Sequence, residues 1–248
     1  MSFKEITVSV MGRFLNGFSH RYGVLAAGGK VLSAVLMYAT LVGANAGAFA
    51  GEKITIAALG DSLTQGYGLV QNEGFTAQLQ SFLTAAEQDV EILNAGVSGD
   101  TTAGGLARVD WTLTPDVDAM IVTLGGNDIL RGIAPAQVRA NLDGILAKAA
   151  SKDIPVLLIG MEVPANYGLA YQADFAAIYP DLAAEYDTLY VESFMRPLLE
   201  LGTLPEVLAT YFQRDGIHPN AKGVAIVVQA LGPKVIELAE QVRAQMTH

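Results

Sequence analysis

The chain contains the stretch Ile54-Thr-Ile-Ala-Ala-Leu-Gly-Asp-Ser-Leu-Thr-Gln-Gly66. Its apolar residues 54–59 predict a buried β-strand, because strands covered on both faces are almost continuously apolar. Asp61 and Ser62 follow, at the place where a helix would begin, and taken alone they also fit an ordinary helix cap. The segment predicts a hydroxyl at the carboxyl end of a strand, where a helix dipole favours developing negative charge.

The rest of the chain alternates short apolar runs with longer helical patterns, which is typical of βαβ units and a parallel sheet. We predict an α/β fold, a single three-layer α/β/α domain over residues 51–248, with its ligand crevice at the carboxyl ends of the strands. Pro233 predicts a kink or a division in the last helix. The other predicted strands are residues 90–93, 119–124, 156–159 and 189–191, and the predicted helices are 76–86, 103–111, 136–150, 172–186 and 219–245.

The first fifty residues differ from the rest. They hold four basic residues, Lys4, Arg13, Arg21 and Lys30, against the single acid Glu5, and residues 31–44 are apolar and uncharged. This pattern predicts a signal peptide over residues 1–50, cleaved near Ala46 or Ala50, and a periplasmic or secreted protein. The alternative is an uncleaved anchor, since residues 31–50 carry no charge over a length that spans a bilayer.

Composition excludes several classes of partner. Residues 1–50 hold four of the 15 basic and one of the 25 acidic residues, so the remainder carries a net charge of −13, which argues against nucleic acid. The chain has no cysteine, hence no disulfide and no thiolate ligand. We expect no metal, no cofactor, a monomer, and membrane contact only through the leader or a lipid substrate.

Asp215-Gly-Ile-His218 contains the only histidine between the leader and His248 at the C-terminus. Histidine is the usual general base at neutral pH. A lone histidine also fits a structural role, but an acid three residues earlier can hold its Nδ1 proton across a tight turn. Ser62, His218 and Asp215 are therefore the predicted nucleophile, base and orienting acid.

Two further loops follow predicted strands and supply hydrogen-bond donors. Gly99 lies in residues 94–101, and Asn127 lies in residues 124–128. Each loop alone fits a glycine turn with a capping asparagine. Acyl transfer needs preorganised N–H donors for its oxyanion, and a glycine amide with an asparagine side chain can provide them.

The chain resembles the SGNH (GDSL-type) hydrolases in four motifs, in the same order and at similar spacing: Gly60-Asp-Ser-Leu63, Ser98-Gly99, Gly125-Gly-Asn-Asp128 and Asp215-Gly-Ile-His-Pro219. It is most similar to the bacterial thioesterase I, lysophospholipase and arylesterase group. The resemblance implies the same triad, an oxyanion hole of Ser62, Gly99 and Asn127, and a flavodoxin-like sheet in the order 2-1-3-4-5. It also implies hydrolysis of carboxylic esters or thioesters.

The acyl side of such a site requires apolar side chains. The resemblance implies a mobile loop around Leu130 to Pro135 that contacts the acyl chain, and it extends to the stretch Pro164-Ala-Asn-Tyr-Gly168. We predict Leu130, Ile133, Tyr167 and Leu169, which lie in or beside these two segments, as substrate-binding residues. They do not indicate the length of the acyl chain.

Other readings of the motifs are weaker. Ser62 lacks the Gly-x-Ser-x-Gly context of α/β-hydrolases, and no phosphate-binding glycine motif follows the first strand. A carboxylate pair drawn from Asp61, Asp128 and Asp215 would suit a glycosidase. The alternative of a different kind is a non-catalytic carbohydrate-binding or scaffold domain with the same α/β/α fold.

Overall fold

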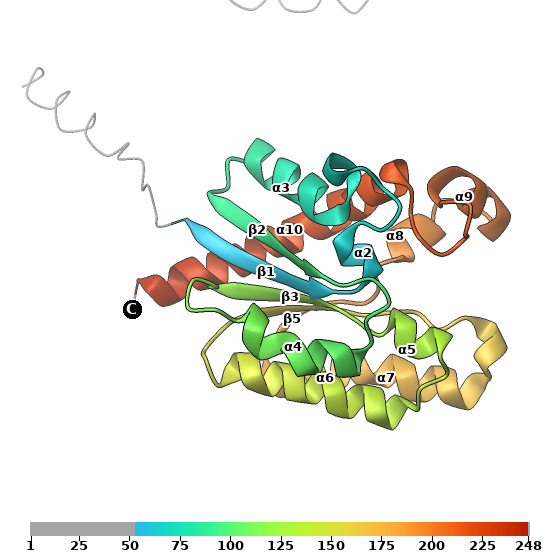
Figure 1. Ribbon diagram of the computed structural model, residues 1–248, viewed down its shortest axis with the longest axis horizontal. Coiled ribbons are helices and arrows are strands. Elements are labelled where there is room, and N and C mark those ends of the chain that lie inside the picture. Colours follow the sequence, from blue (N-terminus) through green and yellow to red (C-terminus); the bar gives the residue numbers. More distant parts are fainter. Residues whose placement is uncertain (1–52, 248) are drawn as a thin grey trace, which may run out of the picture. The chain divides into compact units, whose positions relative to one another are not determined.

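Five parallel strands form one sheet, in the order β2-β1-β3-β4-β5, in the computed structural model, which describes residues 53–247 (Figure 1). This order confirms the predicted fold. Residue Gly60 of β1 is in register with Gly96 of β2 and Thr123 of β3, so three strands end side by side. The strands are β1 (Ile54–Gly60), β2 (Val90–Gly96), β3 (Ala119–Thr123), β4 (Val156–Ile159) and β5 (Leu189–Val191).

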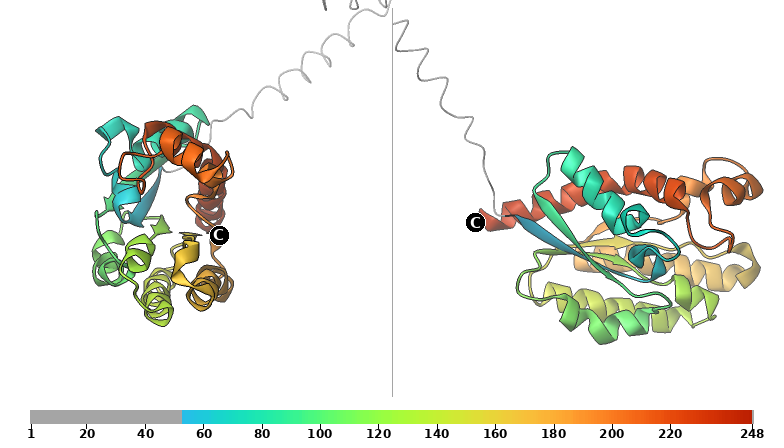
Figure 2. Two further views of the ribbon diagram at one scale, coloured as in Figure 1. Left: turned by 90° about the vertical axis from the view of Figure 1, so that its right-hand side faces the viewer. Right: turned by 45° about the horizontal axis from the view of Figure 1, so that its top comes forward.

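Helices cover both faces of the sheet, which gives the three predicted layers (Figures 1 and 2). One face is covered by α3 (Phe75–Ala85) and α10 (Ala221–Met246), and the other by α4 (Thr102–Thr112), α6 (Pro135–Ala150) and α7 (Leu169–Tyr186). Four short helices lie near the carboxyl ends of the strands: α2 (Ser62–Gln65), α5 (Gly126–Leu130), α8 (Arg196–Leu199) and α9 (Leu204–Tyr211).

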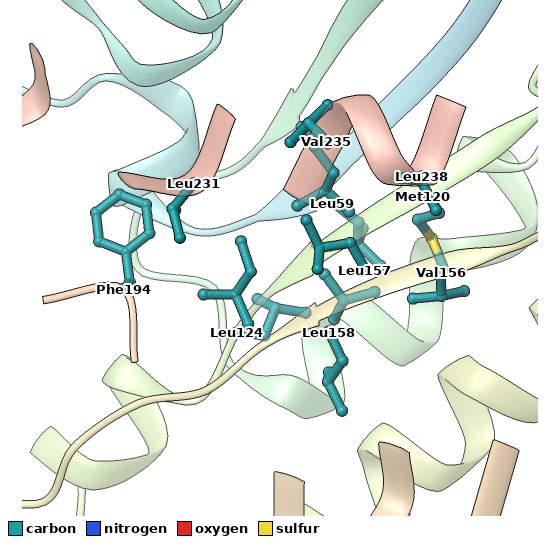
Figure 3. Close-up of a cluster of buried hydrophobic side chains, with 14 of the residues drawn as sticks. Leu59, Met120, Leu124, Val156, Leu157, Leu158, Phe194, Leu231, Val235 and Leu238 are labelled. Atoms are coloured by element: carbon teal, nitrogen blue, oxygen red, sulfur yellow. The ribbon is translucent and has the colours of Figure 1, made fainter. Parts of the chain in front are cut away.

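The core joins the sheet to α10 (Figure 3). Strand residues such as Leu59 and Leu157 meet Leu231, Val235 and Leu238 of that helix, and each of these side chains is at most 1% exposed. Burying one leucine stabilises a fold by about 1.5–3 kcal/mol. The apolar face of α10 therefore fixes the last helix, and the loop just before it, against the sheet.

The structure excludes one of the two effects predicted for Pro233, a division of the last helix. Helix α10 runs through Pro233 without a division. Proline has no N–H and leaves the carbonyl of Gln229 without its helical partner, at a cost of about 3 kcal/mol. The buried Leu231 and Val235 on either side of Pro233 offset that cost and keep the helix on the sheet.

The two ends of the described chain lie at the same end of the sheet. Strand β1 starts beside the end of α10, whereas α5 and α9 lie at the opposite end (Figures 1 and 2). The predicted signal peptide falls outside the described residues. Within residues 53–247 no helix has the length and hydropathy needed to cross a bilayer.

Candidate active site

Ser62 is the first residue of α2, at the carboxyl end of β1. The helix begins there because Asp61 caps it, accepting a hydrogen bond from the Leu63 N–H at 3.0 Å. Gly60 lets the turn close: a Cβ on it would lie 2.0 Å from Thr64 Oγ1. Ser62 is only 8% exposed, and as the first helical residue its N–H has no partner within the helix.

His218 contacts Ser62 from the loop before α10. Its Nε2 lies 2.8 Å from Ser62 Oγ, and its Nδ1 lies 2.7 Å from Asp215 Oδ2. The carboxylate holds the proton on Nδ1, so the lone pair of Nε2 faces the serine hydroxyl. The structure thus brings together the three side chains that the sequence nominated from segments 156 residues apart.

Asp215 is held by its own turn. Its Oδ1 accepts the N–H groups of Ile217 and His218 at 2.9 and 3.0 Å. Partial burial raises the pKa of Asp215, but these N–H groups and the His218 ring outweigh it and lower the pKa below its ordinary value. Gly216, with a φ of 67°, supplies the left-handed residue that the tight turn requires.

Gly99 and Asn127 lie beside Ser62 and line the same cavity. Gly99 adopts a φ of 81°, and its carbonyl accepts a hydrogen bond from Arg131 Nη2 at 2.8 Å. Asn127 donates from Nδ2 to Asp61 Oδ2 at 3.1 Å. The two predicted oxyanion donors therefore come from different segments, the loop after β2 and the start of α5, and each is held by a charged side chain.

A buried cluster joins the loop that carries Gly99 to helix α5. Asp128, with no exposed surface, accepts the N–H and the hydroxyl of Thr102 at 2.9 and 2.6 Å. Asn141 donates to the same hydroxyl at 3.0 Å. Because Asp128 follows Asn127 and Thr102 follows the loop of Gly99, the cluster sets the spacing between the two donors.

The cavity beside Ser62 has a volume of about 450 Å³ and a mostly apolar wall. Tyr67 forms part of its edge, and the Tyr67 ring packs against the His218 ring with centroids 4.7 Å apart. The remaining apolar side chains of the wall are Leu63, Ile129, Leu130, Met161, Pro164, Met195, Leu199, Leu204, Leu208, Phe212 and Ile217.

Only one of the four predicted substrate-binding residues reaches this cavity. Leu130 lines it, whereas Ile133, Tyr167 and Leu169 lie outside the lining among the described residues. Ile133 packs against the core, Tyr167 packs on the ring of Tyr171, and Leu169 is 85% exposed at the start of α7. Closeness to a motif in the sequence therefore did not predict which side chains line the cavity.

The segment from Met195 to Phe212 supplies much of the wall instead, and none of its residues was predicted to bind substrate. Its one local signal was Thr203-Leu-Pro-Glu206, the pattern of a capping box. Glu206 accepts hydrogen bonds from the N–H and hydroxyl of Thr203, which starts α9. That signal predicts a helix but not its place over the cavity.

Within residues 53–247 no three histidine or carboxylate side chains are grouped to hold a metal ion. The carboxylates Asp61, Asp128 and Asp215, considered for a glycosidase pair, bond to an amide, a threonine and a histidine respectively. None of the three pairs with another.

A parallel sheet in the order β2-β1-β3-β4-β5, with a serine, a histidine and an aspartate in contact at its carboxyl edge, defines the class of the SGNH hydrolases. The chain belongs to the GDSL-like lipase/acylhydrolase family, whose sequence model matches residues 58–226. This match confirms the predicted family, and the esterase and thioesterase relatives described next confirm the predicted enzyme class, the ester hydrolases.

Individual relatives agree with the family. The chain is similar to the esterase TesA of Pseudomonas aeruginosa, with 40% identity over 166 residues, or 66% of this chain and 79% of the relative. It is 38% identical over 167 residues to thioesterase 1/protease 1/lysophospholipase L1 of Escherichia coli, covering 67% of this chain and 76% of that one. Among solved structures, the SGNH-hydrolase family esterase AlinE4 has a TM-score of 0.61 and 44% identity, covering 75% of this chain and 97% of its own.

Proposed function

We propose that the chain hydrolyses carboxylic esters or thioesters with Ser62 as nucleophile, His218 as general base and acid, and Asp215 as the residue that orients His218. The observation that carries this proposal is the continuous line of contacts from Asp215 Oδ2 to His218 Nδ1 and from His218 Nε2 to Ser62 Oγ, at 2.7 and 2.8 Å. A base within hydrogen-bond reach, itself oriented by a third group, is what an unactivated hydroxyl needs.

In the first half of the reaction, His218 Nε2 takes the Ser62 proton while Ser62 Oγ bonds to the acyl carbonyl carbon. The carbonyl oxygen becomes an oxyanion, which accepts from the Ser62 and Gly99 amides and Asn127 Nδ2. When the tetrahedral centre collapses, the bond to the alcohol or thiol breaks, and His218 returns its proton to that leaving group. The acyl group remains on Ser62.

In the second half, water replaces the leaving group. His218 takes a proton from the water as its oxygen attacks the acyl carbonyl, and the same three donors hold the second oxyanion. Collapse breaks the bond to Ser62 Oγ, which recovers its proton from His218. The products are a carboxylic acid and free enzyme.

The shape of the cavity supports an apolar acyl group. Its wall is built mainly of leucine, isoleucine, methionine and aromatic side chains, and Ser62 and His218 also line it. Burying each methylene of an acyl chain there contributes about 0.8 kcal/mol. Aryl esters, acyl thioesters and lysophospholipids all present such a group, and the nature of the leaving group stays open among them.

Turnover of p-nitrophenyl butyrate by the wild type and by Ser62→Ala tests the proposal. We expect the variant to lose at least about 10³ in kcat, because the nucleophile is absent. Equal rates would remove the serine mechanism. Absence of turnover by both proteins, across aryl esters, acyl thioesters and lysophospholipids, would favour the non-catalytic binding domain.

We also propose that the mature protein works outside the cytoplasm. The proposal rests on the basic and then apolar pattern of residues 1–44 and on the small residues around Ala46 and Ala50. Mass spectrometry of the protein recovered from a periplasmic fraction tests it. A mass that retains residue 1 would overturn cleavage, and recovery only in the cytoplasm would overturn export.

A further inference from the structure

Asp61 is a buried carboxylate for which the triad has no use. It is 2% exposed and lies between the nucleophile and the oxyanion loop. Each of its oxygens has a partner: Oδ1 accepts the Leu63 N–H at 3.0 Å, and Oδ2 accepts Asn127 Nδ2 at 3.1 Å. Asp61 and Asn127 both line the cavity.

The hydrogen bond from Asn127 fixes which way its amide faces. An ionised carboxylate can only accept, so it must meet the NH₂ group of Asn127 and never its carbonyl oxygen. That group has two N–H bonds, and Asp61 engages one of them. The second is left for a carbonyl oxygen bound in the cavity.

We propose that Asp61 is a positioning residue of the oxyanion hole: its ionised carboxylate holds the Asn127 amide with one N–H directed at the reacting carbonyl. This inference rests on the proposed function, because it assigns a role toward the same oxyanion. Asp61 itself does not touch the reacting atoms.

Loss of the charge would reverse the arrangement. A protonated Asp61 has a hydroxyl to donate, and Asn127 would then turn its carbonyl oxygen toward Asp61. Asn127 would no longer be fixed as a donor to the oxyanion, and its oxygen would be repelled by negative charge there.

The charges around Asp61 make this loss measurable. Burial raises the pKa of Asp61 to about 6, although the N–H of Leu63, the Asn127 amide and the nearby His218 each lower it. Asp100, from the loop after β2, raises it further, and is itself paired with Arg108 at 2.7 Å. From α7, the buried hydroxyl of Tyr179 also faces this region, and it donates to the Leu124 carbonyl.

Two variants separate the two tasks of Asp61. Asp61→Ser keeps an oxygen that can cap α2 but offers none to Asn127. Asp61→Asn has one carbonyl oxygen for two donors, the Leu63 N–H and the Asn127 amide. When that oxygen caps Leu63, the NH₂ group of the new side chain faces the NH₂ group of Asn127. Asp118→Ser is the matched control, since its carboxylate accepts the Thr55 N–H at 2.7 Å just before β3, at the other end of the sheet.

Steady-state kinetics with p-nitrophenyl butyrate should show the loss in kcat and not in KM. Removing one oxyanion donor typically costs about 10² to 10³ in rate, and we expect Asp61→Ser to lose about 10-fold to 10²-fold. Asn127→Ala should cost little more when added to Asp61→Ser, because both remove the same donor. Asp118→Ser should keep kcat within about twofold.

The pH profile distinguishes positioning from a purely structural role. The wild type needs ionised Asp61, whose pKa burial raises to about 6, so the ratio of wild-type kcat to Asp61→Ser kcat should fall from about 10–10² above pH 7 towards about one below pH 5. Wild-type kcat in folded Asp61→Ser, multiplicative losses in the double variant, or a ratio that stays constant with pH would each overturn the inference. An active Ser62→Ala would instead overturn the serine mechanism on which it rests.

Discussion

Thr102 gives both its N–H and its hydroxyl to Asp128, at 2.9 and 2.6 Å, and so connects the start of α4 to α5 inside the protein. The loop before Thr102 carries Gly99, and the residue before Asp128 is Asn127. The distance between the two proposed oxyanion donors thus depends on a buried threonine–aspartate contact in which neither donor takes part. The precision of the site depends on a bond outside it.

Thr102→Val should test that contact as a source of stability. Valine keeps the shape but leaves an Asp128 oxygen and the Asn141 amide without their partner, and a hydrogen bond to a charged group contributes about 1.5–3 kcal/mol. We expect the free energy of unfolding, measured by urea denaturation, to fall by about 2 kcal/mol. Thr84→Val, whose exposed hydroxyl bonds to the Gln80 carbonyl, is the control. Equal losses in the two variants would contradict the assignment.

Asp215→Asn should impair catalysis while leaving the fold intact. The amide can donate to His218 Nδ1 and favour the wrong tautomer, a change that costs up to about 10⁴ in kcat in serine proteases. The readout is kcat for p-nitrophenyl butyrate, with circular dichroism to verify folding. Asp187→Asn is the control, because Asp187 ends α7 in a left-handed conformation that asparagine also adopts. A loss of less than about tenfold would argue against Asp215 as the orienting residue.

Leu208→Trp should shorten the range of accepted acyl chains. Leu208 lines the cavity from α9, so a larger ring there takes space from the far end of an acyl group. Each buried methylene contributes about 0.8 kcal/mol, or about fourfold in kcat/KM. The variant should lose that gain on hexanoate and octanoate esters and keep acetate hydrolysis within about threefold. Leu201→Trp, at an exposed position outside the lining, should leave the whole series unchanged.

Asp61 should make stability depend on pH in a defined direction. Its pKa is raised by burial to about 6 in the folded chain, from an ordinary value of 3.8. A raised pKa stabilises the fold below the unfolded value, and this contribution is lost as pH rises through about 6. The excess stability of the wild type over Asp61→Ser should therefore be greater at pH 4 than at pH 7, by roughly 2–3 kcal/mol. Urea denaturation at the two pH values measures it, and a constant difference would show an ordinary carboxyl.

The sequence predicted the fold well because its signals were local. The nearly all-apolar runs at 119–124 and 156–159 have the length and composition of buried strands, and the observed β3 and β4 match them within one residue. Ser62 was nominated because it follows the first predicted strand. His218 was nominated because it precedes the last predicted helix and has an aspartate three residues before it. The division allowed at Pro233 was wrong, since the local cost of a proline carries no information about the core on which its helix packs.

The acyl wall could not be read in the same way. Tyr67, Leu199 and Leu208 reach the cavity because α2, α8 and α9 fold over the ends of the strands, and no periodicity reports that arrangement. Strand β5 has only three residues, and such a short strand does not predict where the chain that follows it lies relative to the cavity. Leu130 was found because it follows Asn127 on the same helix.

The end of the sheet where β1 begins and α10 finishes offers a practical advantage. An affinity handle or a covalent link to a solid support, attached after α10, would hold the protein at the end of the sheet opposite the one where α5 and α9 lie (Figure 1). Helices α5 and α9, which help to line the cavity, would then lie away from the support. Immobilised protein should turn over small esters with the kcat of the free protein, whatever carrier is chosen.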